Sequence, residues 1–531
     1  MKIGVITEGM KVAKWQADAL ETLPGDTEFV IYNCLNSAPG KRQLRHAAYY
    51  LLNLLTIKNP LTRSVPIPST LKIVAKVHFE AAREGSWQSL PPPLLETIGR
   101  DQPVVIVKFG MGLLIVPPSE RLPVPILSYH HGDPSRFRGR PAGFYELLAG
   151  ERTVGQIIQL LSNRLDSGRI VAAAETRALA HSYKQTLIEA YRHSRLLLPT
   201  AVHNAIAKAS WTPPHWGPAY RLPSSRQVLQ LVRILVRNRL SRIIYGLTRE
   251  KRWNVATAPL AQPVTLGSLC ASLEQEARWT PAPMPPRCRF VADPFFHPSQ
   301  GLLVEAMMTD TKRGAIFHMH DRRFQRISGR GGHFSYPSVI RSKGHDYVVP
   351  EVSDWSVALA FPLDEEGLGE PFKLRLPGMP RLVDPTPFIR KNQLYLFANR
   401  ADEGPSVLRL WVASSIDADF TEHPSSPIRI SPRGGRMGGT LLEIPERLIR
   451  VGQDLRGDYG DGISFFEVTR LDSQNYAEVD AGGFRFEHWH GPHTINVARE
   501  ELAFDYYLDR FSPLAGIRRI LERRAAGRMQ G

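Results

Sequence analysis

The chain has 531 residues, of which 43% are hydrophobic and 22% are charged. These values are typical of globular proteins and exclude wholesale disorder, and the length predicts two or three domains. Lys and Arg outnumber Asp and Glu by 67 to 51, and the resulting net charge of +16 favours anionic partners.

Targeting signals and cysteine spacing narrow the class of protein further. The first residues, MKIGVITEG, lack the charged and apolar regions of a signal peptide. The sequence contains no run of about 18 apolar residues, the length that a membrane-spanning helix needs. Cys34, Cys270 and Cys288 lie far apart, so we expect neither a disulfide framework nor a bound metal. We expect a cytoplasmic protein, with any contact to the inner membrane being peripheral.

The first 176 residues alternate short β-branched runs with helical stretches. Residues 2–7 (KIGVIT), 28–33, 104–108 and 126–129 read as strands, and residues 12–23 read as a helix. Nearly continuous apolar strands separated by helices are typical of a parallel sheet that is covered on both faces. Residues 1–176 are therefore predicted to form an α/β, Rossmann-like domain.

The middle of the chain, residues 177–250, is predicted to be a helical linker. Residues 178–201 and 226–247 carry apolar side chains at i, i+3 and i+4 spacing. The second helix is amphipathic and basic, with Arg226, Arg233, Arg237, Arg239 and Arg242. Such a helix either packs between domains with its arginines in water or lies on an anionic membrane.

Residues 251–510 change to short strands punctuated by Pro, Gly, Asp and Asn. Landmark residues recur about every 45 to 55 positions, near the length of a four-stranded propeller blade; they are Asp293, Tyr336, Asp384, Gly438 and His493. Five landmarks predict a five-bladed, all-β propeller over residues 251–510. A basic C-terminal tail, residues 511–531, follows it.

Three short motifs in the first domain occur in a fixed order. They read Ser128-Tyr129-His130, then Arg138-Gly139, then Leu165-Asp166-Ser167-Gly168. This stretch resembles the formyltransferase family, which includes methionyl-tRNA formyltransferase, glycinamide ribonucleotide formyltransferase and the sugar N-formyltransferases. That family usually reads N-x-H, a basic residue with glycine, and L-D-x-G. The resemblance spans about the first 176 residues.

The resemblance implies N10-formyltetrahydrofolate as the donor substrate and a catalytic set of His130, Asp166 and Ser128. An imidazole can move protons near neutral pH, and the formyl oxygen needs a hydrogen-bond donor as its negative charge develops. Ser128 stands where the family has asparagine, so this donor is shorter. The implied folate-binding residues are Phe109, Gly110, Gly112, Arg138 and Gly139.

A dinucleotide-binding loop is not expected. Gly110-Met111-Gly112 follows a strand, but Ile115 stands where the G-x-G-x-x-G pattern requires its third glycine.

The C-terminal region resembles the N-terminal domain of plant glucosamine inositolphosphorylceramide transferases, through Ala292-Asp293-Pro294-Phe295, Asp384-Pro385-Thr386-Pro387-Phe388 and His493-Thr494-Ile495-Asn496. The resemblance implies a five-bladed propeller related to arabinanase-like glycosidases. Those enzymes place a glutamic acid in blade four, where this chain has Met437-Gly438-Gly439. We therefore expect recognition of a carbohydrate or glycolipid acceptor more than hydrolysis. The candidate acceptor residues are Asp293, Tyr336, Glu351, Asp384, Arg436, Gln453, Asp454 and His493.

Together these features predict N-formylation of an amino sugar, nucleotide-linked or lipid-linked, in the synthesis of a surface polysaccharide or glycolipid. Two alternatives stay open. The propeller could transfer or hydrolyse glycans beside a vestigial formyltransferase domain, or the chain could be a non-catalytic scaffold that binds glycans or phospholipids. Nucleic acid is not an expected partner, because zinc-finger, basic-zipper and aromatic RNA-binding motifs are missing from the sequence.

Overall fold

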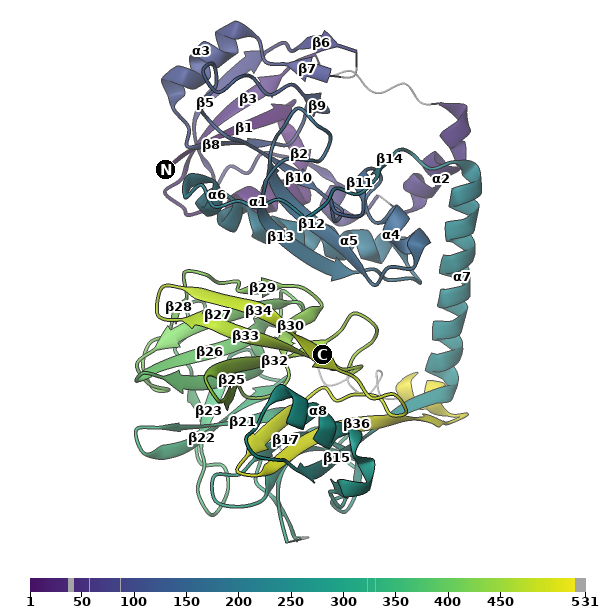
Figure 1. The fold of residues 1–531 in the computed structure, drawn as a ribbon, viewed down its shortest axis with the longest axis vertical. Coiled ribbons are helices and arrows are strands. Elements are labelled where there is room, and N and C mark those ends of the chain that lie inside the picture. Colours follow the sequence, from purple (N-terminus) through teal and green to yellow (C-terminus); the bar gives the residue numbers. More distant parts are fainter. Residues whose placement is uncertain (37–42, 57, 86, 322, 330, 521–531) are drawn as a thin grey trace. The chain divides into compact units, whose positions relative to one another are not determined.

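The computed structural model describes residues 1–36, 43–56, 58–85, 87–321, 323–329 and 331–520. The chain divides into two units, residues 1–241 and 242–531 (Figure 1). The boundary falls inside the long helix α7 (Ser225–Thr248), which agrees within one residue at each end with the helix predicted over 226–247. Of the predicted C-terminal tail, residues 521–531 lie outside the described residues.

The first unit is built on a seven-stranded sheet with the order β13-β12-β10-β8-β1-β3-β5 (Figure 1). Its strands are β1 (Lys2–Glu8), β3 (Glu28–Cys34), β5 (Lys72–Phe79), β8 (Val105–Lys108), β10 (Ile126–His130), β12 (Thr153–Leu160) and β13 (Ile170–Arg177). The predicted all-parallel sheet is wrong at one edge, because β12 runs antiparallel to both β10 and β13. The short β12–β13 connection forms a hairpin, which cannot join parallel strands.

Helices and short strands complete the first unit. The helices are α1 (Lys14–Glu21), α2 (Ala47–Thr56), α3 (Pro92–Asp101), α4 (Phe144–Ala149), α5 (Tyr183–Ser194) and α6 (Leu198–Ile206). The short strands are β2 (Lys11–Ala13), β4 (Ser64–Pro66), β6 (Ala82–Glu84), β7 (Trp87–Ser89), β9 (Leu113–Leu114), β11 (Arg138–Gly139) and β14 (Ala219–Tyr220). The helix predicted over 178–201 is two helices, with a 3-10 turn at Arg195–Leu197 between them. Apolar side chains of α3 pack on the central strands, as Leu94 and Ile98 do with Ile6 and Ile106.

The second unit consists of five antiparallel sheets. The first sheet joins β15 (Arg249–Pro259) and β16 (Thr280–Pro281) to β35 (Ile495–Ala498) and β36 (Glu501–Phe511), so strands from both ends of the unit pair with each other. A helix, α8 (Leu266–Glu274), packs its buried leucines into the same core as this sheet.

The other four sheets follow one another along the chain. The second holds β17 (Cys288–Phe296), β18 (Leu302–Met308), β19 (Gly314–His320) and β20 (Arg323–Arg326), and the third holds β21 (Phe334–Ser342), β22 (His345–Val352), β23 (Leu359–Pro362) and β24 (Phe372–Lys373). The fourth holds β25 (Leu382–Arg390), β26 (Gln393–Arg400), β27 (Val407–Ala413), β28 (Thr421–Glu422) and β29 (Arg429–Ile430). The fifth holds β30 (Arg433–Met437), β31 (Leu442–Ile444), β32 (Arg447–Asp454), β33 (Ile463–Leu471) and β34 (Tyr476–Phe484). The strand order gives five sheets and does not by itself close them into a propeller.

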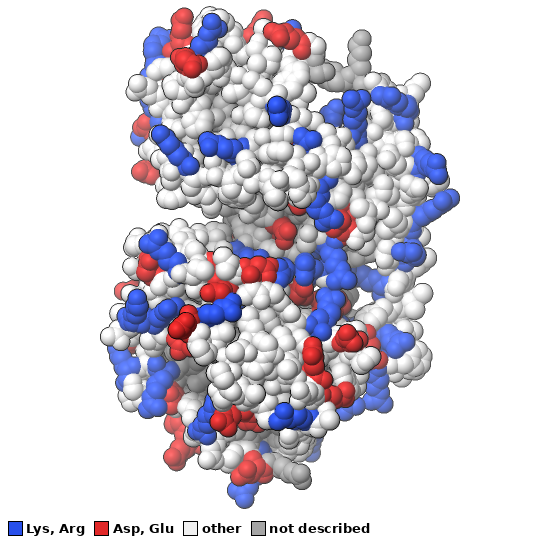
Figure 2. Space-filling model, viewed as in Figure 1, with Lys and Arg blue, Asp and Glu red and all other residues white. Residues whose placement is uncertain are grey.

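Charge is distributed over both units. On the face drawn in Figure 2, Lys and Arg side chains are scattered among Asp and Glu and do not gather into one basic patch. Among the described residues, no helix combines the length and the apolar character needed to cross a bilayer.

Candidate active site

His130 and Asp166, which the sequence paired, lie together in the first unit. His130 ends β10, and its Nδ1 lies 3.4 Å from Oδ2 of Asp166. The other ring nitrogen, Nε2, is 3.0 Å from the carbonyl oxygen of Phe137, to which it can only donate. A neutral ring with its proton on Nε2 therefore presents an unprotonated Nδ1 to the Asp166 carboxylate. The side chain of His130 is buried, which holds this geometry in place.

The loop between β12 and β13 presents Asp166 to the histidine. Asp166 adopts a left-handed backbone with φ of 45°, and its Oδ2 accepts a 2.8 Å hydrogen bond from the Gly139 N–H. A Cβ atom on Gly168 would lie 1.8 Å from the carbonyl oxygen of Leu160, so the loop can close only with glycine here. The L-D-x-G motif thus encodes both a carboxylate and the turn that aims it.

The loop after His130 is equally constrained. A Cβ atom on Gly132 would lie 2.6 Å from the Phe137 carbonyl oxygen and 2.8 Å from Nε2 of His130. Arg138 is predicted to bind folate. In the structure its guanidinium donates hydrogen bonds within the protein, to the Gly217 carbonyl and to Ser167 Oγ at 2.7 Å each. Arg138 and Gly139 therefore brace the Asp166 loop from the opposite side.

Ser128 lies in a row of polar residues that crosses three strands. In the sheet register Ser128 pairs with Lys108 of β8 on one side and with Gln159 of β12 on the other. Side chains of paired residues share one face of a sheet, and His130 lies two residues further along that face. Gln159 donates from Nε2 to Asp166 at 3.4 Å and accepts from the Gly168 N–H at 2.8 Å. The predicted catalytic set is therefore flanked by Lys108 and Gln159, neither of which the sequence singled out.

Lys108 is a half-buried cation facing this site. Burial lowers its pKa to about 8, and the nearby carboxylates of Glu8 and Asp166 oppose the shift. Its ammonium donates no hydrogen bond to any residue that the structure describes. The available signal in the sequence was a lysine that ends the apolar run VVIVK one strand before Ser128.

The turn predicted to line a folate site follows β8. The ring of Phe109 packs near those of Trp15 and Tyr129, at centroid distances of 6.1 and 6.0 Å. Met111 has a φ of 62° and donates its N–H to Oε1 of Glu8 at 2.8 Å. A Cβ atom on Gly110 would lie 2.9 Å from the Glu8 backbone nitrogen, so a side chain is not tolerated there.

The neighbouring His131 has a different character. Burial, with a smaller contribution from His130, lowers the pKa of His131 to about 3, so its ring stays neutral. The ring packs edge-on against Trp15, and its Nε2 lies 2.9 Å from Ser194 Oγ.

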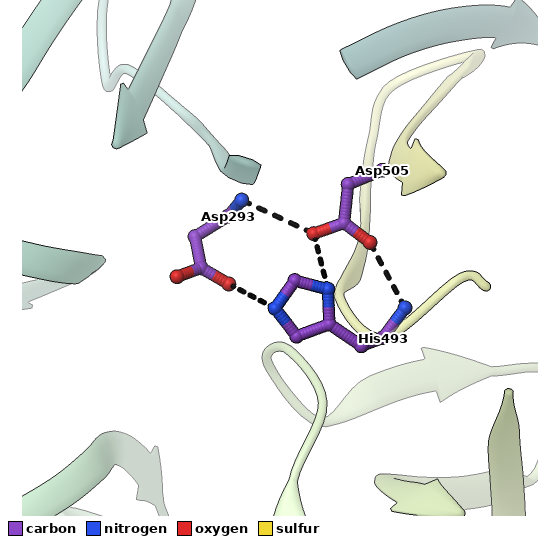
Figure 3. Close-up of side chains that lie close together, drawn as sticks. All are labelled: Asp293, His493 and Asp505. Atoms are coloured by element: carbon purple, nitrogen blue, oxygen red, sulfur yellow. Dashed lines mark hydrogen bonds and ion pairs between the residues drawn. The ribbon is translucent and has the colours of Figure 1, made fainter. Parts of the chain in front are cut away.

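A second polar cluster lies in the second unit, around His493. Its two ring nitrogens lie 3.2 Å from Asp293 and 2.8 Å from Asp505 (Figure 3). Burial alone would lower the pKa of His493, but the carboxylates of Asp505 and Asp293 outweigh it and raise that pKa to about 10. These three residues have the spacing of a metal site. The protonated imidazole already supplies the cation between the carboxylates, however, and a protonated ring nitrogen cannot bind a metal.

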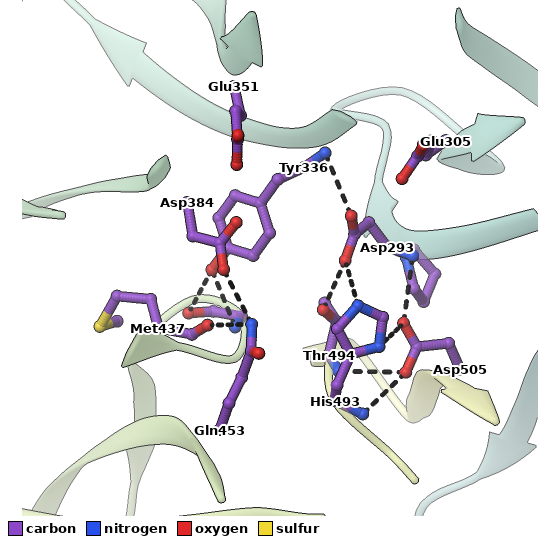
Figure 4. A network of polar contacts seen from close by, with 12 residues as sticks. Asp293, Glu305, Tyr336, Glu351, Asp384, Met437, Gln453, His493, Thr494 and Asp505 are labelled. Carbon is purple, nitrogen blue, oxygen red and sulfur yellow. Dashed lines mark hydrogen bonds and ion pairs between the residues drawn. The ribbon is translucent and has the colours of Figure 1, made fainter. Parts of the chain in front are cut away.

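Hydrogen bonds extend this cluster across the sheets (Figure 4). The N–H of Tyr336 donates to Asp293 at 3.3 Å, and the Tyr336 hydroxyl lies 2.9 Å from Thr386 Oγ1. Asp384 accepts from Arg436 at 3.0 Å and from Gln453 at 2.8 Å. Seven of the eight predicted acceptor residues thus meet in one region, counting Glu351, which lies 3.8 Å from Arg436.

Asp454 is the exception, and Glu305 and Asp505 are residues of this region that sequence reasoning missed. The carboxylate of Asp454 pairs with Arg456 at 2.8 Å and takes no part in the network of Figure 4. Burial, reinforced by Asp293, raises the pKa of Glu305 well above its ordinary value. Burial and then Asp384 raise the pKa of Glu351 to about 7. Glu305 lies in the apolar strand LLVEAMM, where an isolated carboxylate was the available signal.

Two family models match separate parts of the chain. Residues 70–201 match the formyl transferase model, and residues 247–503 match the model for the N-terminal region of glucosamine inositolphosphorylceramide transferase 1.

Relatives of the second region are plant proteins. Glucosamine inositolphosphorylceramide transferase 1 of Oryza sativa subsp. japonica is 29% identical over 212 residues, which are 36% of this chain and 28% of the rice protein. The Arabidopsis thaliana protein of the same name is 29% identical over 160 residues, 28% of this chain and 20% of that protein. The matched region thus spans under a third of either plant protein.

Solved structures similar to the first unit are formyltransferases. The N-formyltransferase from Helicobacter canadensis, in complex with folinic acid and dTDP-3-aminofucose, shares 11% identity over 44% of this chain and 80% of that one, with a TM-score of 0.27. Glycinamide ribonucleotide transformylase 1 from Symbiobacterium toebii shares 15% identity over 39% of this chain and 88% of that one, also with a TM-score of 0.27. The chain therefore joins a formyl transferase segment, matched over residues 70–201, to a segment of the glucosamine inositolphosphorylceramide transferase 1 N-terminal family, matched over residues 247–503.

Proposed function

We propose that the first unit transfers a formyl group from N10-formyltetrahydrofolate to the amine of an amino sugar. The observation that carries this proposal is the His130–Asp166 pair, held by the glycines of three ordered motifs inside a segment that matches the formyl transferase family. The amine nitrogen bonds to the formyl carbon and loses a proton, and the folate N10 leaves and gains one. Such a transfer needs a proton acceptor and a donor for the formyl oxygen.

The residues after β8 fit a folate donor, which supplies the activated formyl group. The turn over residues 109–112 offers an aromatic ring, Phe109, and a tight backbone that contacts Glu8. Nearby, the buried Nε2 of Gln88 has no hydrogen-bond partner among the described residues, and its Oε1 would lie 3.8 Å from a Cβ on Gly112. A polar ring edge such as that of a pterin would satisfy this orphaned donor.

His130 is proposed to accept the amine proton at Nδ1. That atom has a free lone pair when the ring is neutral and Nε2 donates to the Phe137 carbonyl, and it faces Asp166 at 3.4 Å. Once protonated, Nδ1 gains an ion pair with the carboxylate, so Asp166 stabilises the charged ring and fixes its orientation. This assigns Asp166 to both proton handling and positioning.

Lys108 is proposed to replace the family asparagine as the donor to the formyl oxygen. Ser128 has a short side chain, and its cross-strand partner Lys108 carries a charged donor that no described residue engages. A cation stabilises a developing oxyanion more strongly than a neutral amide does. Lys108, on the adjacent strand, would then compensate for the asparagine of N-x-H that this chain lacks.

For the second unit we infer a closed five-bladed propeller. Its support is a ring of hydrogen bonds that passes from each sheet to the next and returns to the first: Asp293 to Tyr336, Tyr336 to Thr386, Asp384 to Arg436, Gly438 to Ile495, and Thr494 to Asp293. The bonded residues lie in β17, β21, β25, β30 and β35, or directly beside β30 and β35. Sheets whose inner strands meet around one axis are the blades of a propeller.

The rim of this ring is proposed to bind the carbohydrate part of the acceptor. Glu351 and Arg436 are partly accessible there, and the guanidinium lies 5.3 Å above the ring of Tyr459, which is 38% exposed. Charged and aromatic groups together are the usual lining of a sugar site. A nucleotide-linked or lipid-linked amino sugar, in a cytoplasmic step of polysaccharide or glycolipid synthesis, is the acceptor class that unites both segments.

The test incubates the full chain with N10-formyltetrahydrofolate and a panel of nucleotide-linked and lipid-linked amino sugars. Tetrahydrofolate release and a mass gain of one formyl group on the acceptor are measured together. We expect turnover in the wild type and a loss of about 10²- to 10⁴-fold in His130→Ala. His203→Ala, at an exposed position of α6, is the matched control. Undiminished turnover in His130→Ala, or no folate turnover with any acceptor, contradicts the proposal.

A second candidate is glycosyl transfer or hydrolysis by the second unit itself. The specific observation is a pair of carboxyl groups with opposed pKa values, because that of Glu351 is raised to about 7 while that of Asp293 is lowered. One acid and one carboxylate are what glycosidic chemistry needs. Cleavage or transfer of a glycan that is lost in Glu351→Gln and kept in His130→Ala would select this function.

A further inference from the structure

Helix α7 exposes an apolar stripe on its outer face. Within the first unit its exposed apolar residues fall at spacings of three, four and four, so they line one side of a helix with 3.6 residues per turn; they are Leu229, Val232, Val236 and Leu240, and each is at least 36% exposed. This pattern differs from an ordinary surface helix, whose outer face is polar.

The stripe is not the face that α7 uses for packing. About a third of the way round the helix, Val228 and Leu231 are buried in a core that includes Tyr49 and Leu52 of α2. The helix is therefore apolar on two faces, and the core explains only one of them. Its outer face is left without a partner among the described residues of this unit.

Helix α2 adds to the same kind of surface. It packs against α7 through Tyr49 and Leu52, yet leaves Leu51, Leu54 and Leu55 between 57% and 69% exposed. The ten residues of α2 include none with a charged side chain. We call these three leucines and the four apolar residues of α7 the α2–α7 surface.

Arginines flank the stripe on both sides. By helical geometry Arg226, Arg233 and Arg237 fall on one side of it and Arg239 on the other. All four are exposed, and none forms an ion pair with a described residue. Helix α7 contains no Asp or Glu over its 24 residues. A protein partner would have to supply both an apolar groove and several carboxylates, whereas an anionic bilayer supplies both properties at once.

We propose that the α2–α7 surface docks on the interface of an anionic lipid bilayer, with α7 lying in the membrane plane. The apolar stripe enters the boundary between headgroups and acyl chains, and the flanking arginines contact lipid phosphates. The chain then binds the bilayer from one side. This binding is independent of formyl transfer.

The test measures partitioning of the full chain onto vesicles of phosphatidylcholine alone and of phosphatidylcholine with phosphatidylglycerol. We expect binding only to the anionic vesicles, weakened when ionic strength is raised to about 0.5 M. Arg233→Gln/Arg237→Gln should partition about thirtyfold less. Val236→Glu/Leu240→Glu should lose at least about tenfold, and both positions of this pair are exposed, so folding is preserved.

The matched control is Arg121→Gln/Arg152→Gln, which removes the same charge from exposed positions elsewhere in the first unit. It should bind almost as the wild type does. Equal binding to both vesicle types, or equal losses in the two double-arginine variants, overturns the proposal. The proposal is also overturned if Val236→Glu/Leu240→Glu changes only the self-association of the chain, measured by sedimentation. A second copy of the chain would then be the partner that covers the α2–α7 surface.

Discussion

The polar clusters of the two units use their charges in opposite ways. In the first unit Nδ1 of His130 faces the Asp166 carboxylate at 3.4 Å, and the Lys108 ammonium donates no hydrogen bond to a described residue. In the second unit His493 is clamped on both nitrogens, and Asp384 is matched by Arg436 and Gln453. Unused bonding capacity is available to a substrate, whereas a closed network mainly holds the protein together.

The comparison has one informative exception. Glu351 lies at the edge of the second cluster, 3.8 Å from Arg436, with a pKa of about 7. Its carboxyl group is less tied to a counter-charge than that of Asp384, and it carries the second candidate function.

Breaking the His493 cluster should have the largest effect. Replacing His493 by Gln leaves Asp293 and Asp505 buried without their cation, so we expect the free energy of unfolding to fall by about 3 to 5 kcal/mol. Chemical denaturation monitored by tryptophan fluorescence measures this loss. His490→Gln, which removes an exposed pair with Asp509, should cost under about 1 kcal/mol. Equal losses in the two variants would mean that His493 is not the structural cation.

The same cluster should make stability depend on pH. The folded pKa of His493 is about 10, above its ordinary 6.5. Its contribution is therefore complete below pH 6.5 and is lost as the pH rises toward 10, on the order of 5 kcal/mol. Denaturation curves over this range should show the decline in the wild type and in His345→Gln, an exposed control. A flat profile between pH 6.5 and 10 would contradict the assigned protonation.

Replacing Lys108 should reduce catalysis in the first unit without unfolding the protein. We expect Lys108→Met to lower kcat by about 10²-fold with little change in KM, because the donor acts on charge that develops during the reaction. In the wild type kcat should also fall above about pH 8, as the Lys108 ammonium loses its proton. Lys108→Arg should remove this alkaline limb while retaining activity. If kcat of Lys108→Arg still fell above about pH 8, Lys108 would be excluded as the donor.

The smallest effect is expected at Glu351. Because its pKa is about 7, its neutral form is already well populated near neutral pH. The amide of Glu351→Gln imitates that form, so the free energy of unfolding should change by less than about 1 kcal/mol. Asp384→Asn, which breaks the pair with Arg436, is the contrasting variant and should cost several times more. Equal losses of the free energy of unfolding in the two variants would place Glu351 inside the closed network.

Much of the candidate site could be predicted because its residues lie in short ordered motifs. His130 and Asp166 were identified from the resemblance of three ordered motifs to the formyltransferase family, and the glycine of the last motif, Gly168, is a position where a Cβ atom does not fit. Arg138 shows the limit of this reasoning. Its place in a motif was correct, but its guanidinium braces a loop.

Local features of this protein could be predicted from the order of its amino acids: most strands of the first sheet, the order of the motifs, and the long basic helix now seen at Ser225–Thr248. Which residues meet depended on the packing of the whole fold. Lys108 reaches Ser128 because β8 and β10 are neighbours in register, and His493 meets Asp293 across 200 residues of chain. Apolar periodicity sets which face of a strand is buried. It does not specify the neighbouring strand or its direction, which depend on how the whole core packs.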